Sequence, residues 1–242
     1  MQETLTLITG ADKGMGFEMA KELGQKGQHI LLGSRNQANG ERAVTELEKL
    51  DIKVDLVILD VTDEETIQAA AQLIQSKFGY LNILINNAGI ALDAHQSPVD
   101  IPVATIRKDF DVNYFGVIQV TQAMIPLLKQ SETAQIINIS SEMGSLTLAT
   151  TPGSISFDHT AVGYQSSKAA LNMWTIDLAK VLKADKINVN AVNPGWVKTS
   201  FGGSDAGALT PAEVVARTVE LALGAGKLVT GTFSDTHGIV PW

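Results

Sequence analysis

Strand-like and helix-like segments alternate along the whole 242-residue chain, and this alternation constrains the fold more than any other feature. Short runs rich in Val, Ile and Leu are each followed by a longer segment with apolar residues at helical spacing. The expected strands are 4–9, 29–33, 54–59, 81–86, 135–139, 187–192 and 228–231. The expected helices are 14–26, 37–50, 64–78, 103–128, 161–183 and 211–223.

Parallel strands need a crossover connection, usually a helix, so this order predicts a mainly parallel seven-stranded sheet covered on both faces. The predicted fold class is therefore α/β, a doubly wound domain of Rossmann type. No Pro- or Ser-rich linker, charge block or repeat divides the sequence, so we expect residues 1–242 to form a single domain. Two stretches, about 142–160 and 195–209, match no element and are expected to be substrate loops.

Composition excludes several classes of function. Lys plus Arg is 18 and Asp plus Glu is 26, and the net charge of −8 argues against binding to nucleic acid or to an anionic membrane. The absence of cysteine removes disulfides, thiolate metal sites and cysteine nucleophiles, and the four scattered histidines predict no metal site. No apolar run reaches the roughly 18 residues of a membrane span, and the N-terminus lacks the basic region of a signal peptide. We therefore expect a cytoplasmic protein.

A glycine-rich loop, Thr9-Gly10-Ala11-Asp12-Lys13-Gly14-Met15-Gly16, joins the first strand to the first helix. Glycines there permit positive φ and let the backbone approach a pyrophosphate, which the amides and dipole of a helix N-terminus stabilise. The spacing TGxxxGxG differs from GxGxxG, and no Lys-Ser or Lys-Thr follows, so a P-loop ATPase is disfavoured. A turn needed only for close packing of strand and helix is the alternative interpretation.

The end of the second strand bears on cofactor choice. An enzyme that uses NAD usually has an acidic residue there for the ribose 2′-hydroxyl, but this chain has Ser34 and Arg35. A guanidinium can bind a 2′-phosphate through charge-assisted hydrogen bonds, and Lys13 could reach the same phosphate from the glycine loop. The expected cofactor is therefore NADP(H). The alternative is that both side chains are simply solvated surface cations.

Tyr164 and Lys168 begin the helix expected over 161–183. Residues four apart share a helical face, so the phenol and the ammonium can point into one cleft. A free tyrosine has a pKa near 10, and a neighbouring ammonium would favour the phenolate. Ser140 and Ser141 follow the strand over 135–139, where a hydroxyl could polarise a substrate carbonyl. Because adjacent strand residues face opposite ways, the two serines are expected to have different roles.

Together, these motifs resemble the short-chain dehydrogenase/reductase family, and in particular its NADPH-dependent carbonyl reductases. The resemblance implies that Ser141 is the catalytic hydroxyl, with Ser140 its structural neighbour. Tyr164 would exchange a proton with the substrate oxygen, while Lys168 tunes Tyr164 and binds the nicotinamide ribose. Asn113, which matches the helix asparagine of the family, would hold a water that links Lys168 to solvent.

The same resemblance implies further cofactor contacts. Asp60 and Val61 would hold the adenine, although Asp60 could equally help to cap the next helix. Asn86-Asn87-Ala88-Gly89 matches the segment under the adenosine ribose, and Pro194-Gly195 matches the segment beside the nicotinamide, with Thr199 at its carboxamide. The full set of expected cofactor-binding residues is Gly10, Lys13, Gly14, Met15, Gly16, Ser34, Arg35, Asp60, Val61, Asn87, Ala88, Gly89, Tyr164, Lys168, Pro194, Gly195, Val197 and Thr199.

The implied activity is hydride transfer between NADPH and a small-molecule ketone or aldehyde, or the reverse oxidation of a secondary alcohol. One alternative is an NAD-dependent alcohol or hydroxysteroid dehydrogenase of the same family. Another is a non-catalytic nucleotide-binding sensor, against which the complete set of chemistry residues argues. The 23 positions from Ser141 to Tyr164 exceed the usual family spacing. This insertion puts the usual homotetramer in doubt and leaves a monomer or another homo-oligomer open.

Overall fold

The computed structural model describes residues 3–93, 96–195, 209–224 and 229–242. Its strands belong to one sheet in the order β3-β2-β1-β4-β5-β6-β7-β8, and all neighbours are parallel except β7 and β8. The strands are β1 (Leu5–Ile8), β2 (His29–Ser34), β3 (Val54–Ile58), β4 (Ile83–Asn86), β5 (Ala134–Ile139), β6 (Ile187–Val192), β7 (Phe233–Asp235) and β8 (Gly238–Ile239). This is the predicted Rossmann-type α/β architecture.

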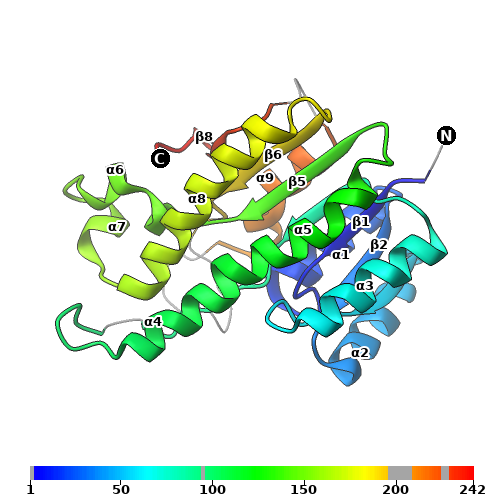
Figure 1. Ribbon diagram of the computed structural model, residues 1–242, viewed down its shortest axis with the longest axis horizontal. Helices are drawn as coiled ribbons and strands as arrows, with labels where there is room; N and C mark the ends of the chain where they lie inside the picture. Colours follow the sequence, from blue (N-terminus) through cyan, green and yellow to red (C-terminus); the bar gives the residue numbers. More distant parts are fainter. Residues whose placement is uncertain (1–2, 94–95, 196–208, 225–228) are drawn as a thin grey trace.

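Helices cover both faces of this sheet (Figure 1). The helices that precede the fifth strand are α1 (Gly14–Gln25), α2 (Gln37–Glu48), α3 (Glu64–Lys77), α4 (Val103–Phe110), the π-helix η1 (Asp111–Gly116) and α5 (Val117–Leu128). Those that follow it are the 3₁₀ helix η2 (Glu142–Gly144), α6 (Leu146–Ala149), α7 (Ile155–Asp158), α8 (Val162–Leu182) and α9 (Pro211–Ala222).

Two apolar layers hold the helices to the sheet. Helices α3, α5 and α8 pack on one face around Leu7, Ile74 and Leu127, while α1, α2 and α9 pack on the other around Ile8, Leu23 and Val215. Strands β1, β2, β4 and β5 are buried along their whole length, as expected of parallel strands covered on both sides. The order in which successive strands are added to the sheet reverses between β1 and β4, and a crevice is expected beyond the carboxyl ends of these parallel strands.

The sheet differs from the prediction at its C-terminal edge, where it has eight strands rather than seven. The last parallel strand is β7 at Phe233–Asp235, not 228–231, and the two-residue strand β8 adds an antiparallel edge. Gly231 donates its N–H to Val189 O but has φ +71, which interrupts the extended conformation just before β7. The predicted helix over 103–128 is correct in extent but contains η1 between α4 and α5.

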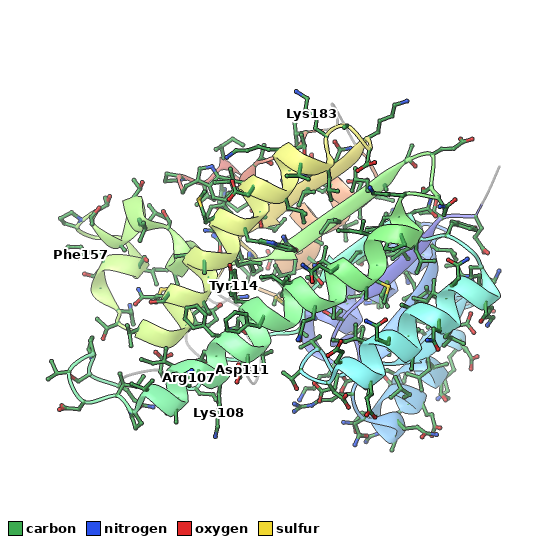
Figure 2. The ribbon with its side chains drawn as sticks, in the orientation of Figure 1. Arg107, Lys108, Asp111, Tyr114, Phe157 and Lys183 are labelled. Carbon is green, nitrogen blue, oxygen red and sulfur yellow. The ribbon has the colours of Figure 1, made fainter. Side chains whose placement is uncertain are left out.

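The segment 142–160, expected to be a loop, contains the short helices η2, α6 and α7. Ser145 and Ser154 cap α6 and α7 by accepting hydrogen bonds from backbone N–H groups. The Thr147 N–H and hydroxyl both donate to Trp242 O, which ties the segment to the C-terminal residue. Leu146 and Phe157 remain 71% and 47% exposed, and Figure 2 shows Phe157 at the outer end of the molecule.

Candidate active site

The glycine loop after β1 is built around close backbone contacts. Gly10 and Gly14 have φ values of +62 and +60, which side chains rarely tolerate. A Cβ on Gly16 would overlap Gly10 O and lie 2.6 Å from Asn87 Nδ2. The Asn87 amide in turn donates to Thr9 O at 2.8 Å and to Gly10 O at 3.0 Å. The strand end that carries Asn87, Ala88 and Gly89 therefore fixes the shape of the loop.

The N-terminus of α1, immediately after this loop, lacks a side-chain cap. Its N-cap residue Lys13 is extended and makes no cap hydrogen bond, whereas Asn36 and Asp63 cap α2 and α3. An uncapped helix start with exposed Gly14 and half-buried Met15 offers backbone amides and a positive dipole end to an anion. The residues of this cradle fit the pyrophosphate of a dinucleotide.

Beside the cradle, Ser34 and Arg35 follow β2. The buried Ser34 hydroxyl donates to Asn36 O at 2.9 Å and accepts from Asn36 N, so it shapes the turn. The side chains of Arg35 and Lys13 are both exposed and belong to adjacent strand-to-helix turns. Two exposed cations therefore follow the carboxyl ends of the neighbouring strands β1 and β2.

The side chains of Asp60 and Val61, which follow β3, have different surroundings. Asp60 Oδ1 accepts hydrogen bonds from the N–H and hydroxyl of Thr62, and the cap of α3 is Asp63, not Asp60. Val61 is 7% exposed and packs in the core, where its carbonyl oxygen would lie 2.8 Å from a Cβ on Gly116. The Val61 side chain is therefore part of the core, whereas the Asp60 carboxylate holds the turn that precedes α3.

The turn after β6 carries Pro194 and Gly195, with Gly195 at φ +82. Asn193 Oδ1 accepts from Gly195 N and from Glu142 N, each at 3.1 Å. The Asn193 side chain therefore joins the Pro194-Gly195 turn to Glu142, the residue that follows Ser141. It holds the turn expected beside the nicotinamide close to the end of β5. Val197 and Thr199 lie outside the described residues.

Tyr164 and Lys168 stand one turn apart at the start of α8. The Lys168 ammonium lies 5.7 Å from the centre of the Tyr164 ring and donates to Ile139 O at 2.8 Å. It is also the charged group nearest to Gly89, whose Cβ would lie 3.7 Å from Lys168 Nζ. The predicted shared face is therefore present, and it points toward the carboxyl ends of β4 and β5.

The two serines after β5 have separate environments, as their alternation predicts. Ser140 is 2% exposed and donates its hydroxyl to Asn172 Oδ1 at 2.6 Å. Ser141 accepts from Met143 N at 3.2 Å and shares a side-chain hydrogen bond with Tyr164. Because the backbone contact uses Ser141 Oγ as an acceptor, its own proton stays available for donation.

Asn113 occupies the π-helix η1, a helix form often found at functional sites. It is fully buried, and its amide exchanges two hydrogen bonds of 2.8 Å with the backbone of Ile90. Asn113 Nδ2 also donates to Ser167 Oγ, which donates to Tyr164 O at 2.7 Å. The asparagine therefore links the strand end after Gly89 to the catalytic turn of α8.

Burial dominates the acid–base properties of this group. It raises the pKa of Tyr164 to about 12, opposed by the hydrogen bond with Ser141 and reinforced by the charge of Asp109. It also lowers the pKa of Lys168 to about 8. The direction is thus opposite to the lowering that we expected from the ammonium: burial raises the pKa of Tyr164, and the opposing contribution comes from Ser141. At neutral pH the phenol is protonated, which suits a proton donor.

Several supporting residues were not singled out from the sequence. Asn193 accepts a hydrogen bond from the backbone of Glu142, and Asn172 accepts one from Ser140. Asp93 and Asp109 are buried beside the first turn of α8. A signal for Asp109 was present, since it precedes Asn113 by four residues and so shares its helical face. Asn193 directly follows β6 and Asp93 lies in the segment between β4 and α4, and the side-chain partners of both depend on tertiary contacts that no local pattern encodes.

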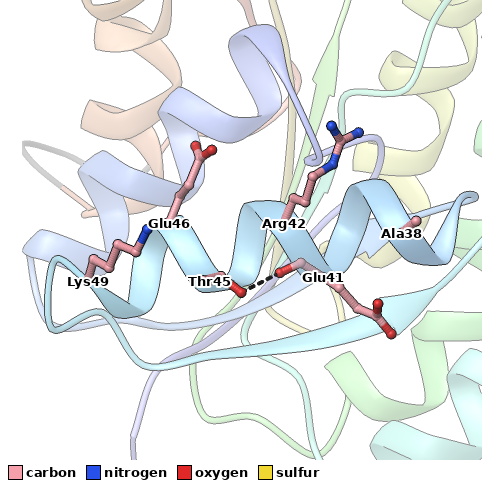
Figure 3. Close-up of a pocket in the computed structure, with 6 residues that line it drawn as sticks. All are labelled: Ala38, Glu41, Arg42, Thr45, Glu46 and Lys49. Atoms are coloured by element: carbon pink, nitrogen blue, oxygen red, sulfur yellow. Dashed lines mark hydrogen bonds between the residues drawn. The ribbon is translucent and has the colours of Figure 1, made fainter.

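One surface hollow in the described part of the chain lies away from these residues. A hollow of about 470 Å³ on the outside of α2 (Figure 3) contains none of the expected site residues. Its lining is Ala38, Glu41, Arg42, Thr45, Glu46 and Lys49. Because two acidic and two basic side chains share it without a buried polar group, we assign the function to the crevice at the strand ends instead.

Within the described residues, no helix combines the length and apolar character needed to cross a lipid bilayer. Among those residues, no three or more His, Cys, Asp or Glu side chains gather closely enough to bind a metal ion.

Comparisons with known proteins agree with this geometry. The short chain dehydrogenase family model matches residues 4–207. The short-chain dehydrogenase anuI of Penicillium roqueforti is 36% identical, over 82% of this chain and 81% of its own length. The (−)-isopiperitenone reductase of Mentha piperita is 31% identical, over 90% of this chain and 91% of its own.

Among solved structures, NADPH-bound carbonyl reductase from chicken fatty liver superimposes with a TM-score of 0.88 at 27% identity, covering all of both chains. Salutaridine reductase from Papaver somniferum gives 0.81 at 27% identity, over 96% of this chain and 99% of its own. With these matches spanning the glycine loop, the serine strand end and the Tyr164–Lys168 turn, the chain belongs to the short-chain dehydrogenase/reductase family of oxidoreductases.

Proposed function

We propose that this protein is an NADPH-dependent reductase of small-molecule ketones or aldehydes. The observation that carries the proposal is the placement of Ser141, Tyr164 and Lys168 together at the strand ends that also form the glycine cradle. The NADPH-bound carbonyl reductase that superimposes over the whole chain supports the same reaction class. An assay of NADPH consumption with a panel of carbonyl compounds tests it.

In this reaction the bound nicotinamide supplies a hydride to the carbonyl carbon. Tyr164 gives its phenolic proton to the carbonyl oxygen, and its raised pKa keeps that proton in place at neutral pH. Ser141 donates a hydrogen bond to the same oxygen as negative charge develops there. Lys168 brings a positive charge near the phenol, which stabilises the phenolate that remains.

The residues proposed to hold the cofactor follow the crevice. The backbone from Gly10 to Gly16 would bind the pyrophosphate, Asp60 and the Val61 backbone the adenine, and the backbone of 87–89 the ribose. Pro194 and Gly195 would lie beside the nicotinamide, with Val197 and Thr199 as further expected contacts. This order is supported by the positive-φ glycines and by the contact of Asn87 with the glycine loop.

NADPH preference follows, in this proposal, from Lys13 and Arg35. Replacing both with alanine should raise KM for NADPH by about 10- to 100-fold, because two charge-assisted contacts to the 2′-phosphate would be lost. KM for NADH, which lacks that phosphate, should change by less than about twofold. The measurement is steady-state kinetics with both nucleotides at a fixed carbonyl concentration.

Arg42→Ala is the matched control, because Arg42 is an exposed cation in the next turn of α2. It should leave both KM values unchanged. Faster reduction with NADH than with NADPH by the unmodified enzyme would contradict the assignment. It would favour the alternative of an NAD-dependent alcohol or hydroxysteroid dehydrogenase.

The segment 142–160 completes the proposal as part of the substrate entrance. It follows Ser141 directly and carries apolar side chains, Leu146, Ile155 and Phe157, that are 38–71% exposed. We propose a cytoplasmic enzyme, in keeping with a cysteine-free sequence, and a monomer or a homo-oligomer other than the usual tetramer.

A further inference from the structure

The first turn of α8, which carries Tyr164, is capped from outside the helix. Its N-cap residue Ala161 has no side-chain acceptor. Instead, Gly163 N donates to Asp93 Oδ2 at 2.5 Å, and Tyr164 N donates to Asp93 Oδ1 at 3.3 Å. A single carboxylate from the segment after β4 therefore satisfies two free N–H groups and fixes the backbone of Tyr164 itself.

A second carboxyl group lies against the first. Asp109 of α4 is fully buried, and its Oδ1 accepts from Leu92 N at 3.1 Å, while its Oδ2 has no hydrogen-bond partner. Both groups flank Gly163, whose Cβ would lie 2.7 Å from Asp109 Oδ2 and 3.3 Å from Asp93 Oδ2. Two ionised carboxylates this close repel each other, whereas one proton would turn the unpartnered oxygen into a donor.

We propose that Asp93 and Asp109 share a proton and act as positioning residues that hold Tyr164 in the first turn of α8. The catalytic part of this inference rests on the proposed carbonyl reduction, but the shared proton does not. Burial is the largest influence on the pKa of Asp109 and raises it to about 6; the Leu92 N–H opposes this rise, and the charge and side chain of Asp93 add smaller contributions that raise it. Asp109 in turn raises the pKa of Tyr164.

Titratable groups face Asp109 from the segment after β4 and from α8. Asp93 faces it from the segment after β4, and Tyr164 faces it from α8. Lys168 of α8 directs its ammonium to Ile139 O instead. On α4 itself Arg107 and Lys108 are exposed, and Figure 2 shows Lys108 pointing away from the molecule. Asp111 of η1 is exposed as well.

The sign of the stability effect follows from these positions. The pKa of Asp109 is higher in the folded protein than its ordinary value of 3.8, so the folded state binds more protons between these two values. Stability is therefore lost as pH rises from about 4 to about 6, and the cost persists above that range. An uncharged isostere at position 109 avoids this cost.

The test compares Asp109→Asn, which keeps a hydrogen-bond donor, with Asp109→Leu, which removes it at similar volume. Asp109→Asn should melt at a higher temperature than the parent by about 4 °C or more at pH ~8, and the difference should shrink as the pH falls and vanish below about pH 4. A difference of constant size across this range would overturn the shared proton. This unfolding measurement needs no activity, so it remains decisive even if no carbonyl substrate is found.

Kinetics then separate positioning from mere structural support. At pH ~5, kcat of Asp109→Asn should stay within about threefold of the parent, while Asp109→Leu should lose about tenfold or more in kcat. KM for NADPH should stay within about twofold of the parent value in both variants, since position 109 does not touch the glycine cradle. Equal loss in the two variants, or a loss confined to KM, would overturn the positioning role. If Asp109→Leu does not fold, the pH-dependent unfolding of Asp109→Asn decides alone.

Discussion

Replacing Tyr164 with phenylalanine should reduce kcat for carbonyl reduction by about 10²- to 10⁴-fold, the usual contribution of a positioned general acid. Phenylalanine keeps the ring in the same volume beside Lys168 but has no proton to give to the substrate oxygen. The substitution also removes the hydrogen bond between the Tyr164 hydroxyl and Ser141. Steady-state rates at saturating NADPH measure the change.

Binding of NADPH is the control for this variant. The glycine cradle and Lys168 remain intact, so the Kd measured by fluorescence titration should stay within about threefold of the parent. Turnover that survives the loss of the hydroxyl would mean that another group donates the proton. Loss of both turnover and binding would instead point to a disturbed fold, which circular dichroism would show.

Replacing Ser141 with alanine should reduce kcat by about 10²- to 10³-fold, comparable to removal of one oxyanion donor. The Ser141 oxygen accepts from Met143 N, so this contact does not use the hydroxyl proton, which can be donated to the developing charge on the substrate oxygen. KM for NADPH should change little because the hydroxyl lies at the substrate end of the crevice. Comparing kcat and both KM values of the two proteins measures the effect.

The adjacent Ser140 supplies a matched control at the same strand end. Its hydroxyl donates to the buried Asn172 Oδ1, so Ser140→Ala should cost about 1–3 kcal/mol of stability. Its kcat should remain within about fivefold of the parent, since it has no access to the substrate. The opposite ranking, with Ser140→Ala slow and Ser141→Ala fast, would exchange the two roles.

Much of the fold follows from the local pattern because parallel strands buried on both faces leave a strong apolar signal. β5 and β6 lie within one residue of the predicted bounds, and α8 begins at Val162 against a predicted 161. The predicted position of the last parallel strand was wrong, because Gly231 has a positive φ and β7 begins only at Phe233. One glycine's backbone conformation is decided by tertiary contacts rather than by apolar spacing.

In the candidate site, too, some residues could be assigned from local sequence patterns and others could not. Tyr164 and Lys168 could be paired from helical spacing, and Ser141 could be separated from Ser140 by strand alternation. Asp93 could not be found this way, because its role depends on Ala161, the N-cap residue of α8, having no side-chain acceptor and on Asp109 lying beside it on α4. The direction of the Tyr164 pKa also needed the structure, since burial is a property of the whole packing.

The most direct measurement of the central claim is NADPH consumption followed by absorbance with a panel of ketones and aldehydes, together with chromatography of the products. The account predicts that NADPH is consumed only when a carbonyl compound is present. It also predicts one molecule of alcohol for each NADPH oxidised, and slower reaction with NADH. Tight binding of NADPH without reduction of any carbonyl in the panel would contradict it, and would leave a nucleotide-binding sensor as the better description.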